Sequence, residues 1–260
     1  MNKLNLRSLN KEPQPSLVNY EELNKTLSVP YPNKTVYNTI IPQNIYQTWH
    51  SKQIPPLMFN AISKIKKCNP RFKYFLFDDN DCREFIKTHF KPDVLHAYDS
   101  LIPGAYKADL WRYCILFING GIYLDIKYAP LNGFRFINLC ESEHLVLDAG
   151  CQGIYNALMV CKPENQLLFK AIRQIVENVK NKYYGHCFLS PTGPKMLPKF
   201  ISLNDSIVDL THTFIDTNNK FINYKGIPII KSYYGHDIEK KQTSIKPHYA
   251  ILWNQRNIYA

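Results

Sequence analysis

Residues 102–130 constrain the fold of this chain most, because they combine a helix signal, a glycine pair and a short strand that ends on a carboxylate. Apolar side chains recur at helical spacing over residues 105–117, which predicts an amphipathic helix. The glycines at 120–121 are expected to end that helix, since glycine adopts a left-handed cap without steric cost. Residues 122–124 are apolar and β-prone, so they predict a buried strand with Asp125 at its end.

The charged residues of this stretch are its candidates for chemistry. Asp109 and Arg112 are three positions apart, so their side chains project from neighbouring positions on one helix face. Asp125 follows the strand, and open α/β sheets bind ligands just beyond the carboxyl ends of their strands. Each piece also has an ordinary structural interpretation, as an exposed ion pair or as an aspartate in a turn. Their combination favours a binding site.

The central block resembles glycosyltransferase family 32. Two runs carry the resemblance: ADLWRY at residues 108–113 and GGIYLD at residues 120–125. The family includes the initiating α-1,6-mannosyltransferase of yeast and many bacterial and viral sugar transferases. Its pattern ends in Asp-x-Asp, whereas this chain has Lys127 in place of the second acid. The resemblance covers most of residues 40–256.

The resemblance implies an α/β fold of the GT-A-like nucleotide-sugar transferase type, with a mostly parallel central sheet flanked by helices. It also implies a retaining glycosyltransferase that moves a hexose or N-acetylhexosamine from a UDP- or GDP-sugar to a glycan or glycoprotein acceptor. Two other classes of protein stay open. One is a catalytically inactive nucleotide-sugar-binding module, because the second acid is missing. The other is a basic nucleic-acid-binding protein, which only the net charge supports.

The resemblance implies catalytic roles for Asp109, Arg112 and Asp125, the first two by gripping hydroxyls of the donor sugar. The expected donor-binding residues are Gln47, Trp49, Asp109, Arg112, Tyr123, Asp125, Lys127, Asn156 and Trp253. Among them, Trp49 offers a stacking face for the base, although a core tryptophan is nearly as good an interpretation. Tyr123 also fits simple strand packing.

The cofactor that the resemblance implies is a divalent metal, Mn²⁺ or Mg²⁺, with Asp125 and His248 as protein ligands. Lys127 changes the chemistry expected there, since an ammonium group repels a cation and attracts phosphate. Two outcomes therefore stay open. Either Lys127 takes over part of the metal's charge role, or the metal is held by the donor diphosphate, Asp125 and His248. We expect a metal whose binding depends on the donor.

The rest of the chain alternates strand and helix signals, which predicts βαβ units. Strands are expected at residues 44–49, 73–77, 144–147 and 155–160, and helices at residues 56–67, 79–88 and 165–181. Residues 190–194, of sequence SPTGP, resemble a family loop on the acceptor side. Residues 1–38 are polar and rich in proline, so we expect an N-terminal extension there and the glycosyltransferase domain at residues 39–260.

The formal charge of +11 suits a polyanionic partner, such as a nucleotide diphosphate. The lysines are scattered and form no recognisable nucleic-acid motif, so we expect no nucleic-acid partner. The seven cysteines include no C-x-x-C pair, which favours reduced thiols. No signal peptide and no run of about 18 apolar residues are seen. A soluble or cytoplasmic protein is therefore expected, in the host cytoplasm if the source is viral.

Overall fold

One nine-stranded sheet organises the computed structural model, which describes residues 29–148, 150, 152–216, 219–243 and 247–260. The strands are β1 (Asn44–Thr48), β2 (Lys73–Phe77), β3 (Gly121–Leu124), β4 (Tyr128–Pro130), β5 (His144–Asp148), β6 (Gly153–Cys161), β7 (Leu210–Asp216), β8 (Asn219–Tyr224) and β9 (Ile227–Ser232). The α-helices are α2 (Pro56–Cys68), α3 (Asp79–His89), α4 (Pro92–Ser100), α5 (Gly104–Asn119), α6 (Gln166–Lys180), α7 (His236–Thr243) and α8 (Tyr249–Asn254). The predicted α/β class is confirmed.

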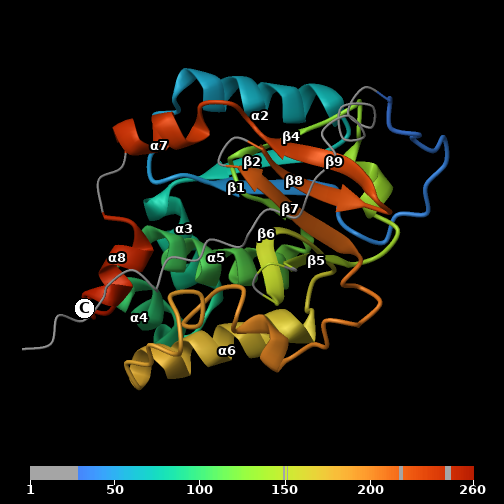
Figure 1. Ribbon diagram of the computed structural model, residues 1–260. Helices are drawn as coiled ribbons and strands as arrows, with labels where there is room; N and C mark the ends of the chain where they lie inside the picture. The colour runs from blue at the N-terminus through green and yellow to red at the C-terminus, as the bar shows by residue number, and fades with distance from the viewer. Residues whose placement is uncertain (1–28, 149, 151, 217–218, 244–246) are drawn as a thin grey trace, which may run out of the picture.

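The sheet lies between two layers of helices. Its strand order is β2-β1-β3-β6-β5-β7-β8-β9-β4. Figure 1 shows α3, α4, α5 and α6 on one side of it, and α2 with α7 on the other. Every strand and helix expected from the sequence is present within two residues of its expected ends. The sequence analysis did not predict α4, α7, α8, β4 or the three strands β7, β8 and β9.

The sheet is mixed, so the prediction of a mostly parallel sheet is wrong in that detail. Among the described strands, β1 pairs in parallel with β2 and with β3, and β5 pairs in parallel with β7. The other five pairings are antiparallel. The connections explain the difference: a short connection returns the chain against its neighbour, whereas a parallel pair needs a long crossover. Between β8 and β9, for example, Lys225 and Gly226 both have positive φ, as tight hairpins prefer.

Helix α5 is the central element of the core. Its residues Asp109 to Leu116 are all buried, which places a charged pair among apolar side chains. Trp111 packs against Phe77 with ring centroids 4.9 Å apart, and Leu116 belongs to the same core cluster. Because the middle of this helix is buried on all sides, the surrounding side chains fix the positions of Asp109 and Arg112.

The glycine pair connects α5 directly to β3, as predicted. Gly120 has a φ of +59°, and its N–H donates to the carbonyl of Leu116 at 2.9 Å. Gly121 has a φ of +107°, and a Cβ atom on it would lie 2.8 Å from the carbonyl oxygen of Asn44 in β1. Glycine at both positions therefore lets β3 pair closely with β1, which sets where Asp125 emerges.

Part of the expected N-terminal extension packs on the domain. The N–H of Tyr31 donates to the carbonyl of Asn132 at 2.7 Å, and its ring meets Phe134 edge-on at 4.7 Å. Lys34 forms an ion pair with Glu141. Residues 1–28 lie outside the described part of the chain, and a domain boundary at residue 38 stays a prediction.

Candidate active site

Asp125 lies immediately after β3 and accepts hydrogen bonds from three side chains. Its Oδ1 accepts from the Arg112 guanidinium at 3.2 Å and from the Tyr123 hydroxyl at 2.8 Å. Its Oδ2 accepts from the Lys127 ammonium at 2.6 Å. About 23% of the Asp125 side chain stays exposed. The carboxylate is thus held in one orientation and still reaches the surface.

Asp109 and Arg112 form a buried ion pair, so their interpretation as an exposed pair is excluded. The Arg112 guanidinium lies 3.2 Å from Asp109 Oδ1, and the side chains are only 6% and 11% exposed. Asn156 donates to Oδ1 of Asp109 at 2.9 Å, and the Thr192 hydroxyl donates to Oδ2 at 2.7 Å. Burial raises the pKa of Asp109, while Arg112 and these hydrogen bonds oppose that rise.

Arg112 links helix α5 to the ends of strands β3 and β6. Besides its two carboxylate partners, it donates to the carbonyl of Asn156 at 2.6 Å and to that of Ala108 at 3.1 Å. Its guanidinium also stacks on the Tyr123 ring at 4.2 Å. Every nitrogen of the guanidinium therefore has a partner within the protein, and the network is rigid.

Lys127 occupies the place of the family's second acid and turns towards the first. Burial alone would raise the pKa of Asp125, but the charges of Lys127 and Arg112 outweigh it and lower that pKa to about 2. Burial opposes the charge on Lys127 as well, yet its pKa is raised because of Asp125 and Tyr155. Both groups are therefore charged over the whole neutral range.

The structure brings seven of the expected donor-site residues together in this one network. They are Gln47, Asp109, Arg112, Tyr123, Asp125, Lys127 and Asn156. Gln47 contributes indirectly, because its amide donates to the backbone carbonyl of Asp125 at 3.3 Å and accepts from the Tyr74 hydroxyl at 2.7 Å.

The two expected tryptophans are not part of this hydrogen-bond network. Trp49 packs with Met58 and Ile126, and its buried indole nitrogen has no partner among the described residues. It is close to the network, since Ile126 directly follows Asp125. Trp253 donates instead to the carbonyl of Tyr184 at 2.8 Å, which uses its polar group in packing.

The residues at this site do not fit a divalent metal held by protein ligands. Both oxygens of Asp125 already accept from cationic groups, Arg112 and Lys127. The described part of the chain holds no group of three or more His, Cys, Asp or Glu residues with the spacing of a metal site. His248 caps α8, where its Nδ1 accepts from the N–H of Ala250 at 3.3 Å. The assignment of Asp125 and His248 as metal ligands stays a prediction.

Several residues around Lys127 were not predicted from the sequence. Tyr155 lies with its ring 5.3 Å from the Lys127 ammonium and stacks on His212 at 3.9 Å. Burial, and then the charge of Lys127, lower the pKa of His236 to about 4 and also lower that of Lys240. These residues come from β6, β7 and α7, so only the fold brings them to Lys127. Thr192, which contacts Asp109, lies in the SPTGP loop that the sequence analysis singled out.

Known proteins share this central block. The family described as "Glycosyltransferase sugar-binding region containing DXD motif" matches residues 55–145. Inositol phosphoceramide mannosyltransferase 3 of Schizosaccharomyces pombe is 41% identical over 158 residues, which cover 60% of this chain and 44% of that protein. The initiation-specific alpha-1,6-mannosyltransferase of Candida albicans is 34% identical over 96 residues, 35% of this chain and 25% of that protein. The chain thus matches less than half the length of these relatives.

A solved structure has the same fold. The protein named PaToxG Glycosyltransferase superposes with a TM-score of 0.52 over 73% of this chain and 78% of its own, at 17% identity. That likeness confirms the glycosyltransferase type of α/β fold and says nothing further about chemistry. Residues 55–145 thus match the DXD-motif glycosyltransferase family, the family-32-like group that the central motifs resemble, with Lys127 in place of the second acid.

Proposed function

We propose that this protein is a retaining glycosyltransferase that moves a hexose or N-acetylhexosamine from a nucleotide-diphosphate sugar to a glycan or protein acceptor. The observation that carries the proposal is the buried network in which Asp109 and Arg112 hold Asp125 at the end of β3. The mannosyltransferase names of the relatives favour mannose as the sugar and a GDP-sugar over a UDP-sugar.

Within the network, the exposed members are the ones that we assign to the donor. The side chains of Asp125 and Lys127 are 23% and 18% exposed, whereas that of Arg112 is only 6% exposed. Asp125 would accept from hydroxyls of the ribose and the sugar, and Lys127 would lie on the diphosphate. Asp109 and Arg112 then act as positioning residues that orient Asp125.

The chemistry asks mainly for positive charge and positioning. Negative charge grows on the diphosphate as the glycosidic bond breaks, and preorganised cations stabilise that charge. In a retaining transfer from the front face, the leaving phosphate takes the proton of the acceptor hydroxyl, so no protein base is required. We propose that Lys127 supplies part of the charge that a Mn²⁺ or Mg²⁺ ion supplies in relatives with a complete Asp-x-Asp.

A panel of UDP- and GDP-sugars tests the proposed function. The donor should raise the melting temperature, since a ligand at a hundred times its Kd stabilises the folded state by about 2.7 kcal/mol. It should also be hydrolysed slowly without acceptor, and Asp125→Asn should remove the hydrolysis. Stabilisation without any turnover would instead support the inactive sugar-binding module. No stabilisation by any member of the panel would overturn the proposal.

Chelation separates the roles of Lys127 and a metal. We expect wild-type turnover to survive exhaustive chelation and Lys127→Ala to lose at least about tenfold, or ~1.4 kcal/mol of transition-state stabilisation. Turnover that returns only with Mn²⁺ or Mg²⁺, together with a nearly silent Lys127→Ala, would assign the charge to the metal and make the lysine a bystander.

A further inference from the structure

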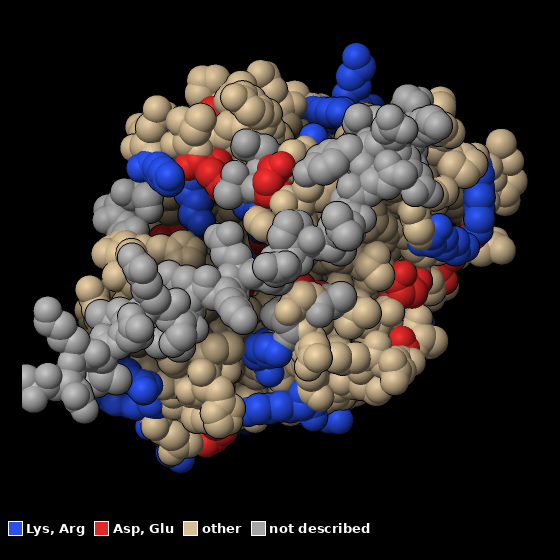
Figure 2. Space-filling view, viewed as in Figure 1, with Lys and Arg blue, Asp and Glu red and all other residues tan. Residues whose placement is uncertain are grey.

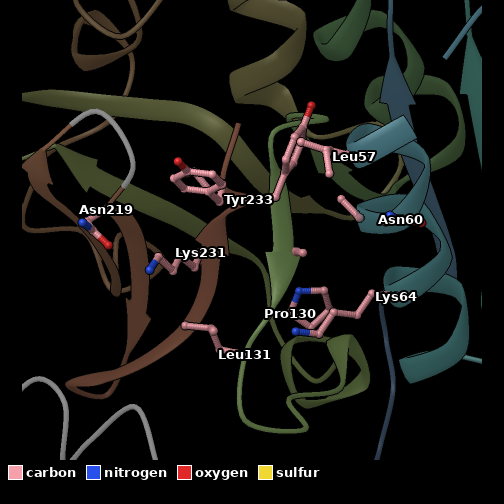
Figure 3. A pocket seen from close by; sticks show the side chains of 12 residues that line it. Leu57, Asn60, Lys64, Pro130, Leu131, Asn219, Lys231 and Tyr233 are labelled. Carbon is pink, nitrogen blue, oxygen red and sulfur yellow. The ribbon is translucent and has the colours of Figure 1, made fainter. Parts of the chain in front are cut away.

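A groove of about 540 Å³ runs between helix α2 and the strands β4 and β9, outside the Asp125 network. Figure 3 shows Lys64 coming from α2 and Lys231 from β9, with Pro130 of β4 between them. The groove shares no lining residue with the network, but Tyr233 in its wall donates its N–H to the carbonyl of Lys127 at 2.9 Å. It is therefore a separate site that adjoins the donor side through Tyr233 and the pairing of β4 with β9.

The charge of this groove is uncompensated. Among its described lining residues there is no carboxylate, and neither Lys64 nor Lys231 has an acidic partner within the described part of the chain. Other lysines do have one, as Lys34 pairs with Glu141 and Lys220 lies 3.5 Å from Asp237. The Lys231 ammonium lies 5.3 Å from the centroid of the Phe221 ring, a contact that leaves its charge without a carboxylate. The two lysines therefore give the groove a preference for an anion.

Polar and apolar groups at the groove match an amphiphilic ligand. Asn60 lines it with an amide, and Tyr234 lines it with a ring and hydroxyl that are 76% exposed. Leu57, also in the lining, is 42% exposed, and Ile238 on the adjoining helix α7 is 58% exposed. We name Leu57, Tyr234 and Ile238 the apolar rim. Large apolar side chains beside unpaired lysines are typical of surfaces that meet lipid.

The apolar rim is held rigidly. The buried carboxylate of Glu239 in α7 accepts from the N–H groups of Leu57 and Met58 at 2.7 and 3.0 Å. It also accepts from the Tyr233 hydroxyl at 2.9 Å. Three hydrogen bonds thus fix α7 against the first turn of α2, so the rim and the lysines keep one relative geometry.

We propose that this groove binds the phosphate-bearing headgroup of an anionic lipid at a membrane surface. Lys64 and Lys231 contact the phosphate, Asn60 contacts headgroup hydroxyls, and the apolar rim enters the interfacial region of the bilayer. No helix of the described residues is long and apolar enough to span a membrane.

Co-sedimentation of the full chain with phosphatidylcholine vesicles, with and without phosphatidylinositol, tests the lipid site. The variant Lys64→Gln/Lys231→Gln should bind the anionic vesicles roughly 30-fold more weakly, because each lysine near an anionic surface contributes about 1 kcal/mol. The matched control is Lys66→Gln/Lys67→Gln, which removes the same charge from the same helix but outside the groove. Leu57→Ser/Tyr234→Ser should weaken vesicle binding without changing the charge. Soluble inositol phosphate should compete with the wild type.

Equal losses of vesicle binding in Lys64→Gln/Lys231→Gln and in the control would show attraction by a diffuse basic surface, which would overturn the proposed site. No preference for anionic vesicles would overturn it as well. Binding of inositol phosphate without any binding to vesicles would reject the lipid and leave a soluble phosphate as the ligand. Donor hydrolysis should be unchanged in Lys64→Gln/Lys231→Gln. If the wild-type protein hydrolyses no donor, only the proposed transferase is refuted, because vesicle binding is measured without donor.

Discussion

At the scale of single residues, the decisive feature is a guanidinium shared by two carboxylates. Arg112 lies 3.2 Å from both Asp109 and Asp125, with one carboxylate almost enclosed and the other partly exposed. A buried charge without its partner is strongly destabilising, whereas the intact pair adds little to the free energy of unfolding. The pair therefore acts mainly by fixing the relative positions of the two side chains. The partly exposed carboxylate, that of Asp125, can then contact a ligand without moving.

We expect Arg112→Met to lower the free energy of unfolding by about 3–5 kcal/mol, because it leaves the buried Asp109 without its cation. Urea unfolding measures this. The control is Arg83→Met, which breaks an exposed bidentate contact to Asp99 and should cost at most about 1 kcal/mol. Similar losses in the two variants would mean that Arg112 is no more than a surface ion pair.

The lowered pKa of Asp125 predicts an acid-dependent loss of stability. A pKa that is lower in the folded state adds stability above the unfolded value of 3.8, and this is lost as pH falls through the folded value of about 2. The difference corresponds to about 2 kcal/mol. Lys127→Met removes one of the cations that lower this pKa. The free energy of unfolding of this variant should therefore fall furthest below that of the wild type above pH 3.8, and the difference should shrink toward pH 2. A deficit that stays constant with pH would contradict this.

At the scale of elements, one helix is capped by another. Helix α2 has no side-chain cap of its own and no acid in its first turn. Glu239 of α7 supplies the missing acceptor from 181 and 182 positions away in the sequence. The negative charge also lies at the helix end where the dipole favours it. The two helices are therefore one structural unit, and it forms the rim of the lysine-lined groove.

We expect Glu239→Ala to lower the free energy of unfolding by about 1–3 kcal/mol, because two N–H groups and the Tyr233 hydroxyl lose their buried acceptor. Amide exchange at Leu57 and Met58 should become faster, as hydrogen-exchange measurements would show. Glu84→Ala, which removes an exposed glutamate, is the control and should change neither quantity. Unchanged exchange at the start of α2 would show that the helix needs no cap from α7.

At the scale of the whole molecule, the formal net charge is +11. On the face shown in Figure 2, lysine and arginine side chains lie in separate groups with acidic side chains among them. Such a distribution raises the general attraction for anions without forming one extended basic stripe. The specific cations are local, at Lys127 beside Asp125 and at the two lysines of the groove.

This distribution predicts a salt effect on donor capture. The screening length falls from about 30 Å at 0.01 M salt to about 8 Å at 0.15 M. The KM for an anionic nucleotide sugar should therefore rise with salt, while kcat stays nearly constant because Lys127 and Asp125 act at contact distance. Steady-state kinetics at several salt concentrations measure both. A fall in kcat with an unchanged KM would contradict long-range attraction.

The sequence by itself determined the helix, the strand and the motifs of the central block, but not all the elements around it. Helical spacing and the glycine pair placed α5 and β3, and the acid after the strand marked Asp125, because these signals depend only on neighbouring residues. The tertiary structure alone decided the mixed sheet, since strand direction depends on which distant segments pair. It also decided that Asp109 and Arg112 are buried, that Lys127 turns onto Asp125 and that His248 caps a helix. Those outcomes depend on contacts between residues far apart in the chain, and local periodicity carries no information about them.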